Sequence, residues 1–117
     1  MKTGRILLDK DTWVEDVAVA ATMLQRMRGL LGFRELPTGH GLLIERCGSI
    51  HTVGMRFALD VVFLDRAWQV CRVCRDVRPG RFMVWGGRHA TRTLEVSAGW
   101  LDVAELVPGT RVTWQED

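Results

Sequence analysis

Short apolar runs separated by glycine, proline and aspartate turns dominate the hydrophobic pattern of this chain. The run Val61-Val62-Phe63-Leu64 is apolar at every position and predicts a central strand, because a strand covered on both faces needs no polar side. Asp65-Arg66-Ala67 turns the chain and residues 68–75 run back, so the two segments predict a β-hairpin. Further strands are predicted at residues 5–8, 14–20, 41–46, 93–96 and 111–114, with an irregular extended stretch over 49–57.

The period of the pattern changes at Thr22, where a helix is predicted. Apolar residues recur on one helical face, at Met23, Leu24, Met27, Leu30 and Leu31. Thr22 is suited to the N-cap, and Gly32 stands where such a helix would end. We expect the apolar face to pack in the core. A second, short helix is predicted over residues 100–106.

These elements predict a mainly β fold with a minor α component. Six to eight short strands with one or two helices are typical of a small β-sandwich or a barrel-like domain. With 117 residues the chain is long enough for one hydrophobic core and too short for two. We therefore expect residues 1–117 to form one domain, with one prominent helix in its N-terminal half.

The composition of the chain indicates an ordered globular protein. The chain is 47% hydrophobic and 26% charged, which is typical of ordered globular proteins. It has no apolar run near the ~18 residues of a membrane helix, so a membrane is not expected as a partner. Residues 1–11 contain no signal-peptide core, although a leader removed earlier would leave no trace. Three cysteines, an odd number, favour reduced thiols and a cytoplasmic location.

Charge is distributed unevenly along the chain. Residues 66–92 contain seven arginines and one acid, giving +6, whereas residues 93–117 contain five acids and one arginine, giving −4. The arginines could bind phosphate or nucleic acid, but no base-stacking motif accompanies them. We favour a solvated face that pairs with the acidic C-terminal residues, and nucleic acid is not expected as a partner.

The segment from Cys47 to Asp65 concentrates chemically active side chains before the central strand. Cys47 and Ser49 are nucleophile types, His51 is a potential base, and Asp60 could orient it. Alternation places Cys47, Ser49 and His51 on one side and Asp60 on the other. Catalysis is one interpretation of these four candidates. The interpretation we favour is structural or binding, with Asp60 buried and satisfied by the Gly54-Met55-Arg56 turn or by Arg56 or His51 as a cation.

The C-x-x-C spacing of Cys71 and Cys74 is a separate case. The two cysteines lie in a strand-like run, where residues i and i+3 point to opposite faces. We therefore expect reduced thiols without a metal, and no metal site elsewhere.

The 47–65 segment also carries a family resemblance. Together with Arg28-Gly29-Leu30-Leu31-Gly32, Gly41-Leu42-Leu43-Ile44 and Val77-Arg78-Pro79-Gly80-Arg81, it resembles the DUF192 family (domain of unknown function 192) over about residues 17–112. The resemblance implies a compact, mainly β domain with one prominent helix, and it implies no reaction. Ala58 departs from the family pattern, which commonly has proline there.

Three functions remain open from the sequence. The leading hypothesis is a non-enzymatic binding or assembly module for a small ligand or a protein, without a cofactor and monomeric or weakly self-associating. The alternatives are a small hydrolase-like enzyme that uses Cys47 or Ser49 with His51 and Asp60, and an anion or nucleic-acid binder that uses the arginines. The candidate ligand-binding residues are His51, Met55, Arg56, Trp85, Arg78, Arg81 and Arg88.

Overall fold

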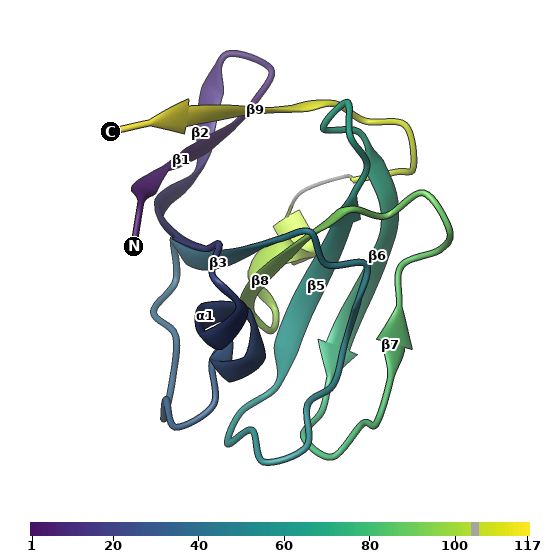
Figure 1. The fold of residues 1–117 in the computed structure, drawn as a ribbon. Coiled ribbons are helices and arrows are strands. Elements are labelled where there is room, and N and C mark those ends of the chain that lie inside the picture. Colours follow the sequence, from purple (N-terminus) through teal and green to yellow (C-terminus); the bar gives the residue numbers. More distant parts are fainter. Residues whose placement is uncertain (104–105) are drawn as a thin grey trace.

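A curled seven-stranded β-sheet forms most of the structure, and a two-stranded ribbon lies beside it (Figure 1). The computed structural model describes residues 1–103 and 106–117. The spatial order of the sheet is β6-β5-β8-β3-β2-β1-β9. Its strands are β1 (Thr3–Leu8), β2 (Asp11–Ala20), β3 (His40–Glu45), β5 (Leu59–Leu64), β6 (Val70–Val77), β8 (Arg92–Ser97) and β9 (Val112–Glu116). The ribbon pairs β4 (Ser49–Ile50) with β7 (Val84–Trp85).

The predicted hairpin and its central strand are confirmed. β5 and β6 pair antiparallel, and β5 also pairs with β8, so β5 has a neighbouring strand on each side. All six β5 residues are buried. Five of them are apolar, as expected for a strand covered on both faces, and the sixth is Asp60. The parallel pair of the sheet is β2 with β3, and helix α1 lies in the connection between them (Figure 1).

The sheet curls until its two edge strands meet at one end. Gln69 and Arg111 form a β-bridge between the β6 edge and the β9 edge. Beside it, the Val70 amide donates to the Thr110 carbonyl at 2.7 Å, and the Val112 amide donates to the Trp68 carbonyl at 2.9 Å. The result is a half-barrel, which confirms the expected mainly β, barrel-like fold.

Both faces of the sheet carry a hydrophobic cluster. Alternation along β3 sends Leu43 to the concave side and sends Leu42 and Ile44 to the convex side. The concave cluster also includes Ile6, Val14, Val17, Val62, Leu94 and Leu101. On the convex side, Leu30 and Leu36 from the β2–β3 connection pack with Met55, Val61 and Phe63. The central strands are therefore covered on both faces.

Helix α1 (Met23–Arg28) begins where the sequence predicts and ends earlier. The Thr22 hydroxyl accepts from the Gln25 amide, and the Gln25 side chain accepts from the Thr22 amide, a capping box that fixes the start. The chain leaves the helix at Gly29, whose φ of 51° an L side chain rarely adopts.

The predicted core face of this helix is wrong. Three of its apolar side chains, Met23, Leu24 and Met27, are exposed at 68%, 79% and 67%. The reason is the early end of the helix: Leu30 lies beyond the last turn and fills the convex cluster, so the helix itself buries no residue.

A single 3-10 turn, η1 (Trp100–Val103), stands where the second helix was predicted, and residues 104 and 105 of that prediction lie outside the described residues. Within the described ranges, neither helical segment has the length and apolar run that a membrane crossing requires. All three cysteines are free thiols.

The expected opposite orientation of Cys71 and Cys74 is wrong. Both cysteines pack against the convex cluster, because the β5–β6 register shifts between Phe63 and Leu64 and breaks the alternation. Burial, with a smaller contribution from the Asp65 charge, raises the pKa of the Cys71 thiol. Among the described residues, no group of three His, Cys, Asp or Glu side chains is arranged to hold a metal ion.

Candidate functional site

A cavity of about 240 Å³ opens on the convex side of the sheet, between the end of α1, β8 and the segment that follows β3. We call it the Glu95 cavity after the one acidic residue in its wall. Its apolar wall comes from Met27, Leu31, Ile44, Ile50 and Met55. Its polar groups come from Arg26, Arg28, Cys47, Ser49, His51 and Glu95, and Gly29 completes the lining.

Backbone contacts to β8 and the loop before it hold the Cys47 segment in place. The Cys47 amide donates to the Thr91 carbonyl, and the buried Thr93 hydroxyl donates to the Cys47 carbonyl, both at 2.9 Å. Gly48 then passes so close to Ala90 that an added Cβ would lie 2.6 Å from the Ala90 carbonyl oxygen. Only glycine permits this approach, which brings the following residues to the cavity mouth.

The structure brings together three of the four residues that the sequence singled out as a group. Cys47, Ser49 and His51 line the same cavity, as alternation along the segment predicted. The Cys47 thiol donates to the Ser49 carbonyl at 3.0 Å, and the His51 side chain is exposed at the rim. Cys47 and His51 make no hydrogen bond to each other in the described part of the chain.

Asp60 lies on the other face of the sheet and does not line the cavity. Its carboxylate is 1% exposed and accepts from the amides of Asp76 at 2.7 Å, Gly99 at 2.9 Å and Leu101 at 3.4 Å. The donors predicted from the sequence, the turn at residues 54–56 or a cation, are therefore wrong. Asp60 instead ties β5 to the end of β6 and to η1.

Glu95 is the residue that sequence reasoning missed. It lies on β8 between Leu42 of β3 and Val61 of β5, and it is 5% exposed. A Cβ added at Gly29 would lie 3.9 Å from Glu95 Oε1, which places the carboxyl group beneath the end of α1. Burial raises the pKa of Glu95 from 4.5 to about 7. Within residues 1–103 and 106–117 the carboxyl group has no hydrogen-bond donor or ion-pair partner.

The alternating pattern of β8 explains why the sequence does not predict a buried Glu95. In the strand Arg92–Ser97, Leu94 and Val96 point to the concave core, so Glu95 reads as the solvent side of a half-buried strand. The convex face is covered as well, however, by residues from other parts of the chain. No local sequence pattern around Glu95 predicts this. In the sequence, Glu95 stands out only as one of the five acidic residues of the stretch 93–117.

Two arginines of α1 approach the cavity from its mouth. The Arg26 side chain is half-buried and makes no hydrogen bond or ion pair among the described residues. Arg28 lines the cavity too, but its guanidinium lies 5.9 Å from the centre of the Phe33 ring, on the other side of the helix. Arg26 is thus the cation available to a molecule in the Glu95 cavity.

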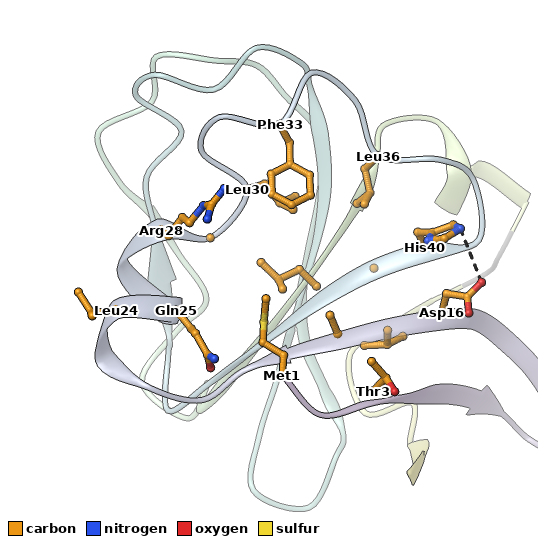
Figure 2. Close-up of a pocket in the computed structure, with 15 residues that line it drawn as sticks. Met1, Thr3, Asp16, Leu24, Gln25, Arg28, Leu30, Phe33, Leu36 and His40 are labelled. Carbon is orange, nitrogen blue, oxygen red and sulfur yellow. Dashed lines mark ion pairs between the residues drawn. The ribbon is translucent and has the colours of Figure 1, made fainter. Parts of the chain in front are cut away.

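A larger cavity of about 610 Å³ lies on the far side of α1 (Figure 2). Its walls are mostly apolar, with Leu30, Phe33 and Leu36 facing it in the close-up. The Asp16 carboxylate and His40 Nε2 form an ion pair at 3.6 Å at its edge, and both side chains are exposed. This cavity offers volume without a buried polar group, so it is the weaker candidate for selective recognition.

Most of the other predicted ligand-binding residues lie outside the Glu95 cavity. Met55 is buried and lines it, together with His51. The remaining ones are exposed and do not line it: Arg56, Arg78, Arg81, Trp85 and Arg88. Arg78 pairs with Asp76 at 3.3 Å, and Arg88 Nε donates to His89 Nε2 at 3.3 Å.

Two other cations of the arginine-rich stretch already have intramolecular contacts. The Arg92 guanidinium donates to Glu45 at 3.4 Å and lies 4.0 Å from the centre of the Trp68 ring. Arg72 donates to the Trp85 carbonyl. These two arginines, like Arg78, use nearby groups rather than the C-terminal acids that the sequence suggested.

Comparison with known proteins gives a family and a fold. The sequence pattern of the family described as uncharacterised, DUF192, matches residues 6–114. None of the curated proteins matches the chain. A crystal structure of a protein of unknown function from Novosphingobium aromaticivorans superposes with a TM-score of 0.83 at 18% identity, covering 96% of this chain and 84% of that one. A candidate transcription regulator from Sinorhizobium meliloti gives a TM-score of 0.82 at 21% identity, covering 97% and 92%. The match over nearly the whole chain shows that this protein belongs to the DUF192 family.

Proposed function

We propose that this protein is a non-enzymatic binding module whose ligand occupies the Glu95 cavity. The observation that carries the proposal is the Glu95 carboxyl group, which is 5% exposed, faces the cavity and has no partner among the described residues. Because the residue is nearly buried, its carboxyl group meets little solvent outside the cavity, and a polar group without a protein partner in such a place costs up to about 1–3 kcal/mol. A ligand with a hydrogen-bond donor would remove that cost.

The surroundings of Glu95 support a small ligand. Apolar side chains and several polar groups converge on one space, and small-molecule sites combine apolar walls with a small set of placed polar groups. The volume of about 240 Å³ is slightly below the range of about 300–1,000 Å³ that is usual for small-molecule pockets, so the proposed ligand is small. The segment at residues 47–51 that forms one wall is fixed by β8, so the site is largely preformed.

A fragment screen tests this function. We would record amide chemical shifts of the ¹⁵N-labelled protein with a panel of small amines, amides and alcohols. Hits should move the amides of Cys47, Ser49, Ile50 and Glu95. Filling the cavity with Ile50→Trp should abolish those shifts, whereas Val53→Trp, an exposed position outside the cavity, should leave them unchanged. Shifts confined to the larger cavity, or no shifts at all, would refute the proposal.

A hydrolase-like activity is the second candidate, favoured by the presence of Glu95 and the Cys47 thiol in the lining of one cavity. A carboxyl group with a pKa of about 7 is suited to acid–base catalysis, and Cys47 lines the same cavity. In such a reaction the Cys47 sulfur would attack an acyl carbonyl while Glu95 took the thiol proton and returned it to the leaving group. Water would then release the acid and restore the thiol.

The two functions separate in one assay. Hydrolysis of p-nitrophenyl acetate that is lost in both Cys47→Ala and Glu95→Gln would establish the enzyme. The binding module that we propose should show no such Cys47-dependent turnover. Cys74→Ala, a thiol outside the cavity, is the matched control.

A further inference from the structure

The Glu95 cavity contains two groups of opposite charge that do not meet. Glu95 lies buried in the floor, and the half-buried side chain of Arg26 is part of the wall formed by α1. The structure records no ion pair between them within 4.0 Å, and neither has another partner among the described residues. Because both belong to the lining of one small cavity, a single molecule can reach both.

From this arrangement, and resting on the proposed function, we propose that the ligand is a small zwitterion of the α-amino-acid class. Its ammonium group would donate to the Glu95 carboxylate, and its carboxylate would accept from Arg26. A guanidinium offers a fork of N–H donors that matches a carboxylate, which a lone apolar wall could not provide. Met27, Leu31, Ile44, Ile50 and Met55 would pack around a short aliphatic side chain.

The other charged and titratable groups of the lining are compatible with this orientation. Arg28 is directed to Phe33, the Cys47 thiol is bonded to the Ser49 carbonyl, and His51 lies exposed at the rim. None of them places a second negative charge beside Glu95. An ammonium ion would therefore supply the one missing counter-charge in the floor of the cavity.

A bound ammonium group should also change the protonation state of Glu95. Burial keeps a large fraction of Glu95 protonated near pH 7, and a bound cation favours its ionised form. Binding should therefore release a proton from the protein below about pH 7, and affinity should rise with pH through that range. A neutral ligand would show no such release.

Three matched probes test the ligand class by calorimetry at pH 7.5. Norvaline carries both charges, butylamine lacks the carboxylate, and pentanoate lacks the ammonium. Norvaline should bind at least about tenfold more tightly than either, because each charged contact that is lost removes a charge-assisted hydrogen bond. In Arg26→Gln, norvaline should fall to the affinity of butylamine. In Glu95→Gln, both amines should lose affinity and pentanoate should be unaffected.

Two control variants and the opposite outcomes complete the test. Arg34→Gln and Glu15→Gln remove an exposed arginine and an exposed glutamate outside the cavity, and neither should change any affinity. Butylamine binding as tightly as norvaline, with no effect of Arg26→Gln, would overturn the zwitterion while leaving Glu95-dependent binding intact. If none of the probes binds but fragments still move the cavity amides, the ligand class fails alone. If nothing binds there, both proposals fail.

Discussion

Glu95 sits in the middle of the sheet, where a carboxyl group is held at a cost. Its neighbours across both strands, Leu42 and Val61, are buried apolar residues. The charged form therefore loses its hydration on folding without gaining a partner from the described residues. A valine or leucine would fit the alternation of the convex cluster, and the ligand that we propose would give the acid at this position a partner.

The pH dependence of stability should report this cost. The folded pKa of Glu95, about 7, lies above its unfolded value of 4.5, so the native state binds more protons between these values. Stability should fall as pH rises from 4.5 to 7, by roughly 3 kcal/mol for this one group, and level off above. Glu95→Gln should remove this component and should be more stable than the parent at pH 8.

Urea unfolding at pH 5 and pH 8 measures the effect, with Glu15→Gln as the exposed control. The difference between parent and Glu95→Gln should grow with pH, and the control should follow the parent. An identical pH dependence in parent and Glu95→Gln would mean that the carboxyl group is solvated in solution.

Asp60 is the opposite case, a buried acid whose partners the fold provides. Asp60→Asn should destabilise the protein by about 1–3 kcal/mol. The substitution replaces one carboxylate oxygen, which accepts from a backbone N–H group, by an NH₂ group, which is itself a donor. Urea unfolding of Asp60→Asn beside Asp16→Asn, an exposed position, measures it. An Asp60→Asn protein as stable as the parent would contradict the structural role.

The two acids show which parts of a site can be predicted from sequence. Cys47, Ser49 and His51 follow from local alternation, because their common side depends only on an extended backbone. The partners of Asp60 are amides at residues 76, 99 and 101, and their proximity depends on the whole topology. The cover over Glu95 likewise comes from residues at least forty positions earlier in the chain, with Gly29 more than sixty positions away. Such contacts leave no local signal.

At the scale of elements, helix α1 divides into a predictable start and an unpredictable end. The N-cap at Thr22 is a local signal and is present as predicted, and the structure adds a capping box with Gln25. The end at Gly29 is set by the route to β3, which draws Leu30 and Leu36 into the convex cluster. A periodic pattern over residues 23–31 cannot reveal that its last two members leave the helix.

This division predicts unequal effects of two leucine substitutions. Leu24→Ala should change stability by less than about 0.5 kcal/mol, because the side chain is 79% exposed. Leu30→Ala should cost about 2–5 kcal/mol, the usual range for a buried leucine. Thermal unfolding of both variants beside the parent tests the assignment. Equal destabilisation by the two substitutions would mean that Leu24 and the apolar face of the helix are buried in the core after all.

At the scale of the whole molecule, the sequence predicts the class of fold and not the order of its strands. The β5–β6 hairpin follows from two adjacent runs and a turn. The neighbours β5 with β8 and β2 with β3 join segments far apart in sequence, and their pairing depends on which faces must be buried together. The meeting of the sheet edges near Gln69 and Arg111 has no sequence signature at all.

That meeting of edges should be visible by amide hydrogen exchange. β9 is an edge strand, and its odd-numbered amides face β1, as the bond from Asp117 to the Thr3 carbonyl shows. The amides of Val112, Trp114 and Glu116 therefore point to the open side, where an edge strand has no partner. Val112 is the exception, because it donates to the Trp68 carbonyl at 2.9 Å.

We therefore expect the Val112 amide to exchange slowly, with protection closer to that of the central strand β5 than to that of Trp114 or Glu116. The comparison is internal to one strand, so differences in temperature, pH and global stability affect all three amides alike. Exchange followed residue by residue in heavy water decides it. If Val112 exchanged as fast as Trp114, the curled sheet would be open at this end in solution. Slow exchange at Val112 alone would show that the half-barrel is closed there by hydrogen bonds between its first and last strands in spatial order.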